Sequence, residues 1–294
     1  MTEAQAPFAA VCHDAGAANQ VIAWIRSAGA GDAVRPVMRG PAERLWRVAF
    51  PDRALVDDVE SALEEVALLV SGTGWGSELE HEARVLARAR GVRSIAVLDH
   101  WVNYGQRFER GGTQVLPDEF WVFDEHAYRL ARETFPGGAI RRMPNRYLED
   151  QVRAIGPVPA HGAECLYLLE PMRTDWGRGV PGEFQALDYF VEKLPSLKLP
   201  PETVIRLRPH PSESASKYAD WIRQHPDLRL AVDDAGSLAD SLSRSAWVVG
   251  CESFGLVVAL ASNRRVQCAL PPWAPPCRLP HEGLVHLSRL AGTP

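Results

Sequence analysis

Short apolar runs alternate along the whole chain with segments in which apolar residues recur at helical spacing. Residues 66–70, for example, form a buried strand pattern, whereas residues 78–90 place Leu79, Ala83 and Leu86 on one helical face. The predicted strands are residues 8–12, 34–38, 66–70, 94–98, 119–123, 140–143, 165–169, 203–207, 228–232, 246–249 and 265–270. Helices are predicted between most of them, and strands that alternate with helices are typical of parallel α/β sheets.

A segment rich in proline and glycine, residues 156–162, divides this pattern into two halves. We therefore predict two Rossmann-like, doubly wound α/β domains facing a cleft, residues 1–158 and 159–294. Residues 105–118 are polar and glycine-bearing, which indicates an exposed loop. The last predicted element is a helix over residues 281–290, placed to pack back on the first domain.

Composition narrows the class of protein further. The 294 residues carry a net charge of -5, which disfavours nucleic acid or an anionic membrane surface as the main partner. The amino terminus shows no signal-peptide pattern, and no apolar run is long enough for a transmembrane helix. The five cysteines are scattered and odd in number, which fits neither a disulfide framework nor a zinc site. We expect a cytoplasmic protein without metal or cofactor, and a homodimer is compatible with the sequence.

Residues 203–211 read as a strand that ends in a rigid basic corner. Pro209 and Pro211 bracket His210 and keep the backbone extended on both sides of it. Arg206, Arg208 and His210 share one face, because side chains alternate along a strand. The carboxyl ends of such strands are where α/β proteins bind ligands. We predict that these three side chains, with Pro211, contact the phosphate or ribose of a nucleotide.

A structural role for the two arginines is the alternative. Arg206 and Arg208 would then pair with Asp233 and Asp234 at the end of a neighbouring strand. Ion pairs of this kind would neutralise the basic face of the corner without any ligand.

A second turn, Glu252-Ser253, follows the strand at residues 246–249 and precedes a helix of small residues. The start of a helix attracts anions, so we predict that Ser253 contacts the donor phosphate and that Glu252 accepts hydrogen bonds from the ribose. Glu170, at the end of the strand at residues 165–169, is assigned to the same site. The alternative is that Ser253 is an ordinary helix cap.

The order of these two motifs resembles one group of GT-B glycosyltransferases. The resemblance covers residues 203–262 and rests on Arg208-Pro209-His210-Pro211 and on the Glu252-Ser253 turn. The group includes bacterial sialyltransferases, polysialyltransferase-like enzymes, Kdo transferases and teichoic-acid glycerophosphotransferases. The resemblance implies that His210 and Pro211 lie at the phosphate or ribose of a cytidine-linked donor, with Ser253 and Glu252 beside them. The acidic pair with glycine that sialyltransferases carry in the first domain is not found here.

Two turns of the first domain supply candidate acid–base groups. His13 and Asp14 follow the first strand, and Asp99 and His100 follow a later one. Transfer to an acceptor hydroxyl needs a group that takes up its proton. Asp14 is the first choice, because small residues around it permit a close approach. The alternatives are a helix cap for Asp14 and an ordinary hydrogen-bonded role for His100.

The glycine-rich loop at residues 71–76 lacks both the lysine of a P-loop and the glycine spacing of a dinucleotide site. We predict instead that it lets backbone approach the acceptor or a phosphate. The residues assigned to this acceptor or phosphate loop are Gly16, Gly72, Thr73, Gly74, Trp75 and Tyr104.

The sequence thus predicts a metal-independent glycosyltransferase that uses a nucleotide sugar, CMP-linked by preference and UDP-linked as a second option. Its acceptor would be a carbohydrate or a small molecule. The alternatives are an epimerase or hydrolase of the UDP-GlcNAc 2-epimerase type, which needs no acceptor, and a non-catalytic subunit that binds nucleotide sugars.

Overall fold

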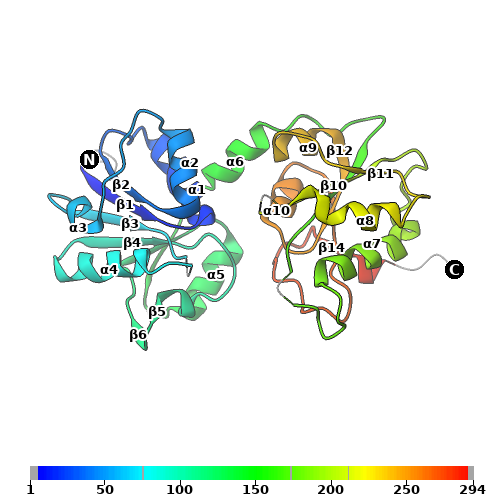
Figure 1. Cartoon of the computed structure of the whole chain (residues 1–294). Helices are drawn as coiled ribbons and strands as arrows, with labels where there is room; N and C mark the ends of the chain where they lie inside the picture. Colours follow the sequence, from blue (N-terminus) through cyan, green and yellow to red (C-terminus); the bar gives the residue numbers. More distant parts are fainter. Residues whose placement is uncertain (1–5, 75, 173, 211, 291–294) are drawn as a thin grey trace. The chain divides into compact units, whose positions relative to one another are not determined.

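The protein is described by a computed structural model over residues 6–74, 76–172, 174–210 and 212–290. The chain divides into two compact units, Met1–Tyr147 and Leu148–Pro294 (Figure 1). The boundary predicted at residue 158 lies further along the chain, after helix α6. Each unit is a six-stranded sheet flanked by helices, and all strand pairs within these two sheets are parallel. The prediction of two Rossmann-like α/β domains is therefore confirmed.

The sheet of the first unit has the strand order β2-β1-β3-β4-β7-β8. Its strands are β1 Phe8–Cys12, β2 Val34–Met38, β3 Leu68–Ser71, β4 Arg93–Val97, β7 Glu119–Val122 and β8 Ala139–Arg142. Its helices are α1 Ala15–Ala28, α2 Gly40–Ala49, α3 Val59–Ala62, α4 Leu79–Ala89 and α5 Glu125–Thr134.

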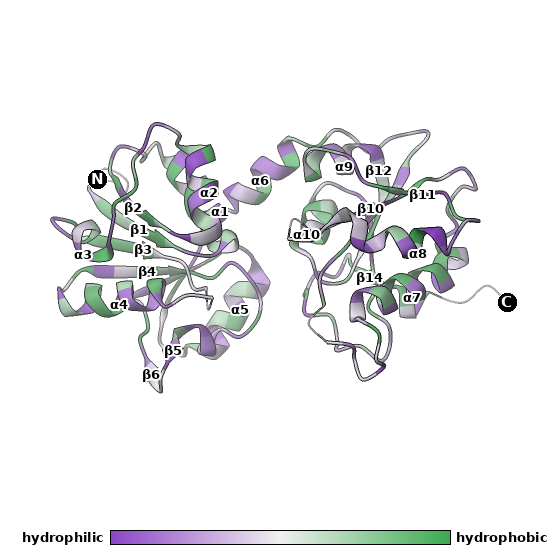
Figure 2. Ribbon diagram, viewed as in Figure 1, coloured by the Kyte–Doolittle hydropathy of each residue, from purple (hydrophilic) through white to green (hydrophobic). Residues whose placement is uncertain are grey.

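Alternation along the strands divides the apolar side chains of this sheet between two faces. Phe8 and Ala10 of β1 pack in one core cluster with α1 and α2. Ala9 and Val11 of the same strand pack in another with α3 and α4. Figure 2 shows the corresponding pattern, with hydrophobic residues along the central strands and a mixture of hydrophilic and hydrophobic residues along the helices. Because both faces are covered, the central strands β1 and β3 are buried at every position, as parallel strands inside a sheet are, whereas the edge strand β8 exposes Arg141 and Arg142.

The sheet of the second unit has the order β11-β10-β9-β12-β13-β14. Its strands are β9 Glu164–Leu168, β10 Ile205–Arg208, β11 Leu230–Val232, β12 Ser245–Gly250, β13 Arg265–Cys268 and β14 Val285–His286. Its helices are α6 Arg146–Arg153, α7 Gly182–Leu197, α8 Ala219–Arg223, α9 Leu238–Arg244 and α10 Phe254–Ala261, with single 3₁₀ turns at η2 Ala215–Tyr218 and η3 Leu287–Arg289.

Two predictions about local structure are wrong. Residues 281–290 do not form a helix: Val285 and His286 pair with β13, and Leu287 is buried in the core of the second unit. An apolar pattern this short is satisfied by an edge strand as well as by a helix. Residues 105–118 are not simply an exposed loop, because they contain the 3₁₀ turn η1 Gly105–Phe108 and the hairpin β5 Glu109–Arg110 with β6 Thr113–Gln114. Buried Phe108 and Val115 anchor this segment.

Candidate functional site

Each sheet has one place where the strand order reverses direction. In the first sheet it lies between β1 and β3, and in the second between β9 and β12. Ligands of open α/β sheets bind beyond the carboxyl ends of the strands at these switch points. The candidate binding residues are therefore those in the turns that follow β1 and β3 in the first sheet, and β9 and β12 in the second.

The turn after β1 presents a histidine–carboxylate pair. His13 Nδ1 lies 2.8 Å from Asp14 Oδ1, and the two side chains are 26% and 37% exposed. Asp14 occupies the N-cap position of α1, yet its side chain makes no capping hydrogen bond. The capping alternative is thus not what the structure shows. The carboxylate is instead paired with an imidazole and still partly open to solvent, which suits acid–base chemistry.

Glycines around this turn make room for side chains of the protein itself. A Cβ at Gly74 would overlap the carboxylate of Asp14, and one at Gly16 would overlap that of Asp99. A Cβ at Gly72 would lie 3.0 Å from a carboxylate oxygen of Glu80. These glycines therefore lie close to side chains of the protein, two partly exposed aspartates and the buried Glu80, and the approach of a substrate or phosphate stays a prediction.

Asp99 is held by a largely buried arginine. Arg107 Nη1 donates to Asp99 Oδ1 at 3.1 Å and to Thr73 Oγ1 at 3.2 Å, and the Arg107 side chain is 7% exposed. Thr73 in turn donates to the carbonyl of Val97 at 2.9 Å. Arg107 thus fixes Asp99 in a side chain–main chain network, whereas Asp14 is more exposed, so Asp14 stays the better candidate base.

Two other predicted residues of the first unit have structural contacts. His100 Nδ1 accepts a hydrogen bond from the main-chain N–H of Trp101 at 2.9 Å, in keeping with the ordinary polar role. Tyr104 is 2% exposed and packs in a core cluster with Phe108 and Phe120. Its assignment to an acceptor loop is corrected, since a ring buried among aromatic side chains cannot touch a substrate. Trp75 lies outside the described residues.

Two buried charged residues of α4, Glu80 and Arg84, contact the turns after β1 and β3 and were missed in the sequence analysis. Glu80 is completely buried, and its Oε1 accepts from the main-chain N–H of His13 at 2.8 Å. Burial raises the pKa of Glu80 above its ordinary value. Arg84, one helical turn later, is 1% exposed and donates to Ser71 Oγ and to the carbonyl of Gly72. Burial lowers its pKa to about 10. Charged residues on the inward face of a predicted helix are the signal that could have revealed them.

In the second unit, a carboxylate fills the predicted anion-binding turn. Glu170 Oε1, beyond the end of β9, accepts from the main-chain N–H groups of Cys251 at 2.8 Å and Glu252 at 2.9 Å. Burial raises the pKa of Glu170 to about 7, although these N–H groups act in the opposite direction. The predicted attraction of an anion to this helix start is corrected for these two N–H groups, because they already bind a side chain of the protein.

Ser253 and Glu252 also have partners within the second unit. Ser253 Oγ accepts from the N–H of Gly255 at 3.1 Å and caps α10, as the alternative interpretation proposed. Arg278 Nε donates to Glu252 Oε2 at 2.7 Å. Arg278 therefore neutralises the carboxylate of Glu252. To accept hydrogen bonds from a ribose, Glu252 would have to give up this ion pair.

The arginines of the basic corner form structural ion pairs. Arg208 Nη1 lies 2.5 Å from Asp233 Oδ2, and the carboxylate of Asp233 is completely buried. Arg206 Nε lies 2.7 Å from Glu164 Oε2, at the start of β9. The predicted phosphate role of Arg206 and Arg208 is corrected, since both charges are already compensated inside the unit.

His210 is the residue of the basic corner that can still contact a ligand. It is exposed, and its Nδ1 accepts from the main-chain N–H of Ser212 at 3.2 Å. In the neutral ring this hydrogen bond puts the proton on Nε2, which then serves as a donor. Pro211 lies outside the described residues. After His210, Lys217 forms ion pairs with buried Glu183 at 2.5 Å and with Glu213, which connect residues 213–217 to the start of α7.

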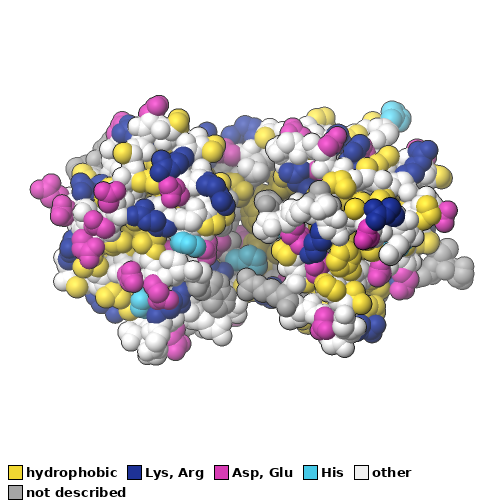
Figure 3. All heavy atoms as spheres, in the orientation of Figure 1, with side chains coloured by type: hydrophobic (Ala, Val, Ile, Leu, Met, Phe, Trp, Pro, Cys, Tyr) yellow, Lys and Arg dark blue, Asp and Glu magenta, His cyan; other side chains and the backbone are white. Residues whose placement is uncertain are grey.

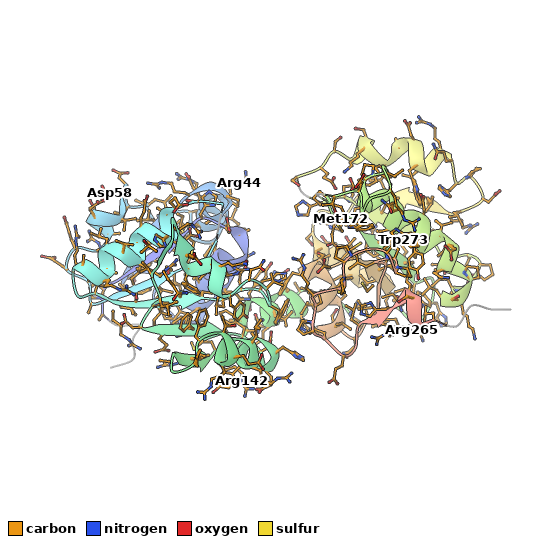
Figure 4. All side chains as sticks on the ribbon, turned by 90° about the horizontal axis from the view of Figure 1, so that it is seen from below. Arg44, Asp58, Arg142, Met172, Arg265 and Trp273 are labelled. Atoms are coloured by element: carbon orange, nitrogen blue, oxygen red, sulfur yellow. The ribbon has the colours of Figure 1, made fainter. Side chains whose placement is uncertain are left out.

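A cavity of about 720 Å³ lies at the opposite, amino-terminal edge of the second sheet. It is lined by the linker and by residues such as Trp247 and Arg265, and Arg265, labelled in Figure 4, lies over the Trp247 ring. Parallel sheets bind ligands at the other edge, and we assign this cavity no role.

Three further observations concern metal sites, membrane-spanning helices and the distribution of surface charge. Within the described ranges, no group of three or more His, Cys, Asp and Glu side chains is placed to hold a metal ion. No helix in that part of the chain is long and apolar enough to cross a membrane. On the face seen in Figure 3, acidic and basic side chains are interspersed in both units.

No protein-family model matches the sequence, and no curated protein does. Solved structures do match the fold. A putative UDP-N-acetylglucosamine 2-epimerase from Listeria monocytogenes is 11% identical, with a TM-score of 0.61, over 90% of this chain and 79% of that one. The S. aureus MnaA–UDP co-structure is 11% identical, with a TM-score of 0.58, over 90% of this chain and 79% of that one. The UDP-GlcNAc 2-epimerase from Neisseria meningitidis bound to UDP-GlcNAc is 10% identical, with a TM-score of 0.55, over 85% of this chain and 78% of that one. The chain thus has the two-domain GT-B-like fold of these nucleotide-sugar enzymes.

Proposed function

We propose that this protein is an enzyme that acts on a nucleotide sugar, in the first place a UDP-linked N-acetylhexosamine, which it epimerises or hydrolyses without an acceptor. The observation that carries the proposal is the acid–base cluster of His13, Asp14 and Glu80 at the switch point of the first sheet. Support comes from solved structures of the same fold, which include complexes with UDP and with UDP-GlcNAc.

The chemistry of the cluster suits this reaction class. Inverting carbon 2 of a sugar requires a proton to leave one face and another to arrive on the opposite face, so the site needs a base and an acid. Asp14, paired with His13, has the exposure and the partner of a base. His13, the partly exposed partner of Asp14, is the group placed to supply a proton, and Glu80, whose pKa is raised by burial, fixes the backbone of His13 by accepting its main-chain N–H.

The second unit supplies the candidate groups for the nucleotide. His210 offers an Nε2 donor, and Glu170 and the start of α10 lie at the switch point of the second sheet. A bound pyrophosphate would gain charge-assisted hydrogen bonds from donors of this kind. Protonation of Glu170 near neutral pH would remove the negative charge that opposes an anion there.

Binding is tested by titrating UDP, CMP and NAD into the full chain in a calorimeter. We expect UDP to bind and His210→Ala to weaken its binding about tenfold, the loss of one charge-assisted hydrogen bond. His161→Ala, an exposed histidine in the linker, is the matched control. Binding by none of the three nucleotides would refute the proposal.

Turnover is tested by incubating UDP-GlcNAc with the protein and no acceptor, and by following free UDP and new sugars by chromatography. We expect conversion by the wild type and a loss of about 10²-fold or more in Asp14→Asn. Asp220→Asn, at an exposed aspartate of the second unit, is the control. Equal rates in the two variants would remove Asp14 from the mechanism.

A CMP-dependent glycosyltransferase is the second candidate, and the exposed His210 after β10 favours it because that position carries the resemblance. It predicts that CMP binds more tightly than UDP and that donor is consumed only when an acceptor is added. Nucleotide binding without any turnover would instead point to a non-catalytic subunit.

A further inference from the structure

Three cysteines that lie far apart in the sequence meet at the carboxyl edge of the second sheet. Cys268 Sγ lies 3.3 Å and Cys277 Sγ lies 3.7 Å from the same acceptor, the main-chain carbonyl oxygen of Cys251. Both sulfurs therefore lie against one and the same oxygen atom. Cys12 and Cys165, the remaining cysteines, are buried in strands β1 and β9.

The topology of the second unit explains this meeting. Strands β12 and β13 are neighbours with Gly250 opposite Cys268, so the turn at Cys251 lies beside the end of β13. The chain then leaves β13 and returns to the same sheet at β14. Residues 269–284 therefore form a loop attached at both ends, and Cys277 lies in its middle. Pro275 and Pro276 precede Cys277 and restrict the backbone that presents it.

We propose that Cys268 and Cys277 form a reversible disulfide under peroxide, and that this bond controls the loop at 269–284 beside the turn that contains Glu252. The existence of the disulfide is independent of the proposed function. Its effect on nucleotide binding rests on that function.

The two thiols have different environments, and these assign their roles. Cys277 is partly exposed, whereas Cys268 is completely buried. The interaction with Cys268 lowers the pKa of Cys277, and the same interaction raises the pKa of Cys268. Thiolate character and exposure decide which cysteine reacts first. Cys277 is therefore the reactive residue and Cys268 the resolving one.

The chemistry is a two-step oxidation with hydrogen peroxide as the oxidant. The Cys277 thiolate attacks one peroxide oxygen, an S–O bond forms, the O–O bond breaks and hydroxide leaves, taking up a proton to become water. The Cys268 sulfur then attacks the sulfenic sulfur of Cys277. The S–S bond forms, the S–O bond breaks, and a second water leaves with the proton of the Cys268 thiol. A small dithiol reverses the reaction by thiol–disulfide exchange.

Contacts of the loop connect this bond to the candidate nucleotide site. Arg278, the residue after Cys277, donates to Glu252 from both its main-chain N–H and its side chain. Trp273 of the same loop, labelled in Figure 4, lies 3.9 Å from the guanidinium of Arg178 and donates to Gln185. Tying Cys277 to β13 changes the position of Arg278, and therefore the charge presented at the turn after β12.

The test treats the full chain with hydrogen peroxide and maps the cysteine peptides by mass spectrometry without reduction. We expect one cross-linked peptide pair containing Cys268 and Cys277, lighter by two hydrogens, that disappears with dithiothreitol. Cys12 and Cys165 in the same sample should stay reduced and serve as internal controls. Five free thiols after treatment, or a disulfide to Cys251 instead, would overturn the proposal.

Two further measurements complete the test. In Cys268→Ser, oxidation of Cys277 should stop at the sulfenic acid and give a dimedone adduct on Cys277; absence of that adduct refutes the assigned order of reaction. UDP is then titrated into reduced and oxidised wild type, and an affinity change of about threefold or more supports control of the turn. Equal affinities overturn that control. If neither form binds UDP, the proposed function fails while the disulfide stands.

Discussion

Glu170 makes the stability of the protein depend on pH near neutrality, and Glu170→Gln should remove that dependence. The carboxylate is buried at the switch point of the second sheet, where the N–H groups of Cys251 and Glu252 compensate only part of its desolvation. Glutamine has nearly the same shape and stays neutral at every pH. The variant therefore isolates the effect of the charge.

The magnitude follows from the pKa of Glu170, which rises from 4.5 to about 7. Because the folded state holds the proton more tightly, the group stabilises the fold most below pH 4.5. That contribution falls as the pH rises through 7 and is constant above it. At about 1.4 kcal/mol for each pH unit, the free energy of unfolding falls by about 3 kcal/mol over this range.

The assay is urea unfolding followed by tryptophan fluorescence, for wild type and Glu170→Gln, at intervals from pH 4.5 to 8.5. The two stabilities should be similar at the acid end, and the variant should be more stable by up to about 3 kcal/mol at pH 8. The difference between the curves, rather than either curve alone, reports on Glu170. A difference that stays constant with pH would refute the reasoning.

Three other substitutions have definite expected outcomes. Arg107→Ala leaves the carboxylate of Asp99 without its partner and should cost about 3–5 kcal/mol of unfolding free energy, measured by chemical denaturation; a cost below 1 kcal/mol would show that the pair is dispensable. Gly74→Ala places a Cβ against Asp14 and should abolish turnover of UDP-GlcNAc while UDP still binds; unchanged turnover would contradict the tight packing. Ser253→Ala removes the cap of α10 and should lower stability by about 1 kcal/mol, whereas no loss in denaturation would contradict its capping role.

The fold was predictable from the sequence because periodicity and small-residue turns recur in every strand–helix unit. The segment after Pro280 was not, because an edge strand is specified by what it pairs with. Its apolar residues, such as Leu284 and Leu287, fill the second core, and a short pattern does not distinguish a strand from a helix.

The candidate site was predictable in position and only partly in contacts. The turns after the strands were correctly expected to hold polar groups, since the carboxyl edge of a parallel sheet collects them. Which group pairs with which was beyond the sequence. Arg206 pairs with Glu164, and Glu170 reaches the turn at Cys251, through neighbours that are brought together only by the sheet order.

Contacts that form only when the elements pack together also explain why some residues were missed. Glu80 and Arg84 belong to a helix whose apolar pattern could be recognised, and their burial shows only when that helix packs against β1 and β3. Cys268 and Cys277 are likewise separated in the sequence, and their meeting depends on the return of the chain to β14.

The central claim, acceptor-free chemistry on a UDP-sugar, is tested most directly by proton and phosphorus NMR of UDP-GlcNAc with the protein in D₂O. Wild type should convert the substrate, either releasing UDP or forming a second UDP-sugar that carries deuterium at carbon 2, and Asp14→Asn should do so far more slowly. A spectrum that stays unchanged with wild type, or changes only after a carbohydrate acceptor is added, would contradict it.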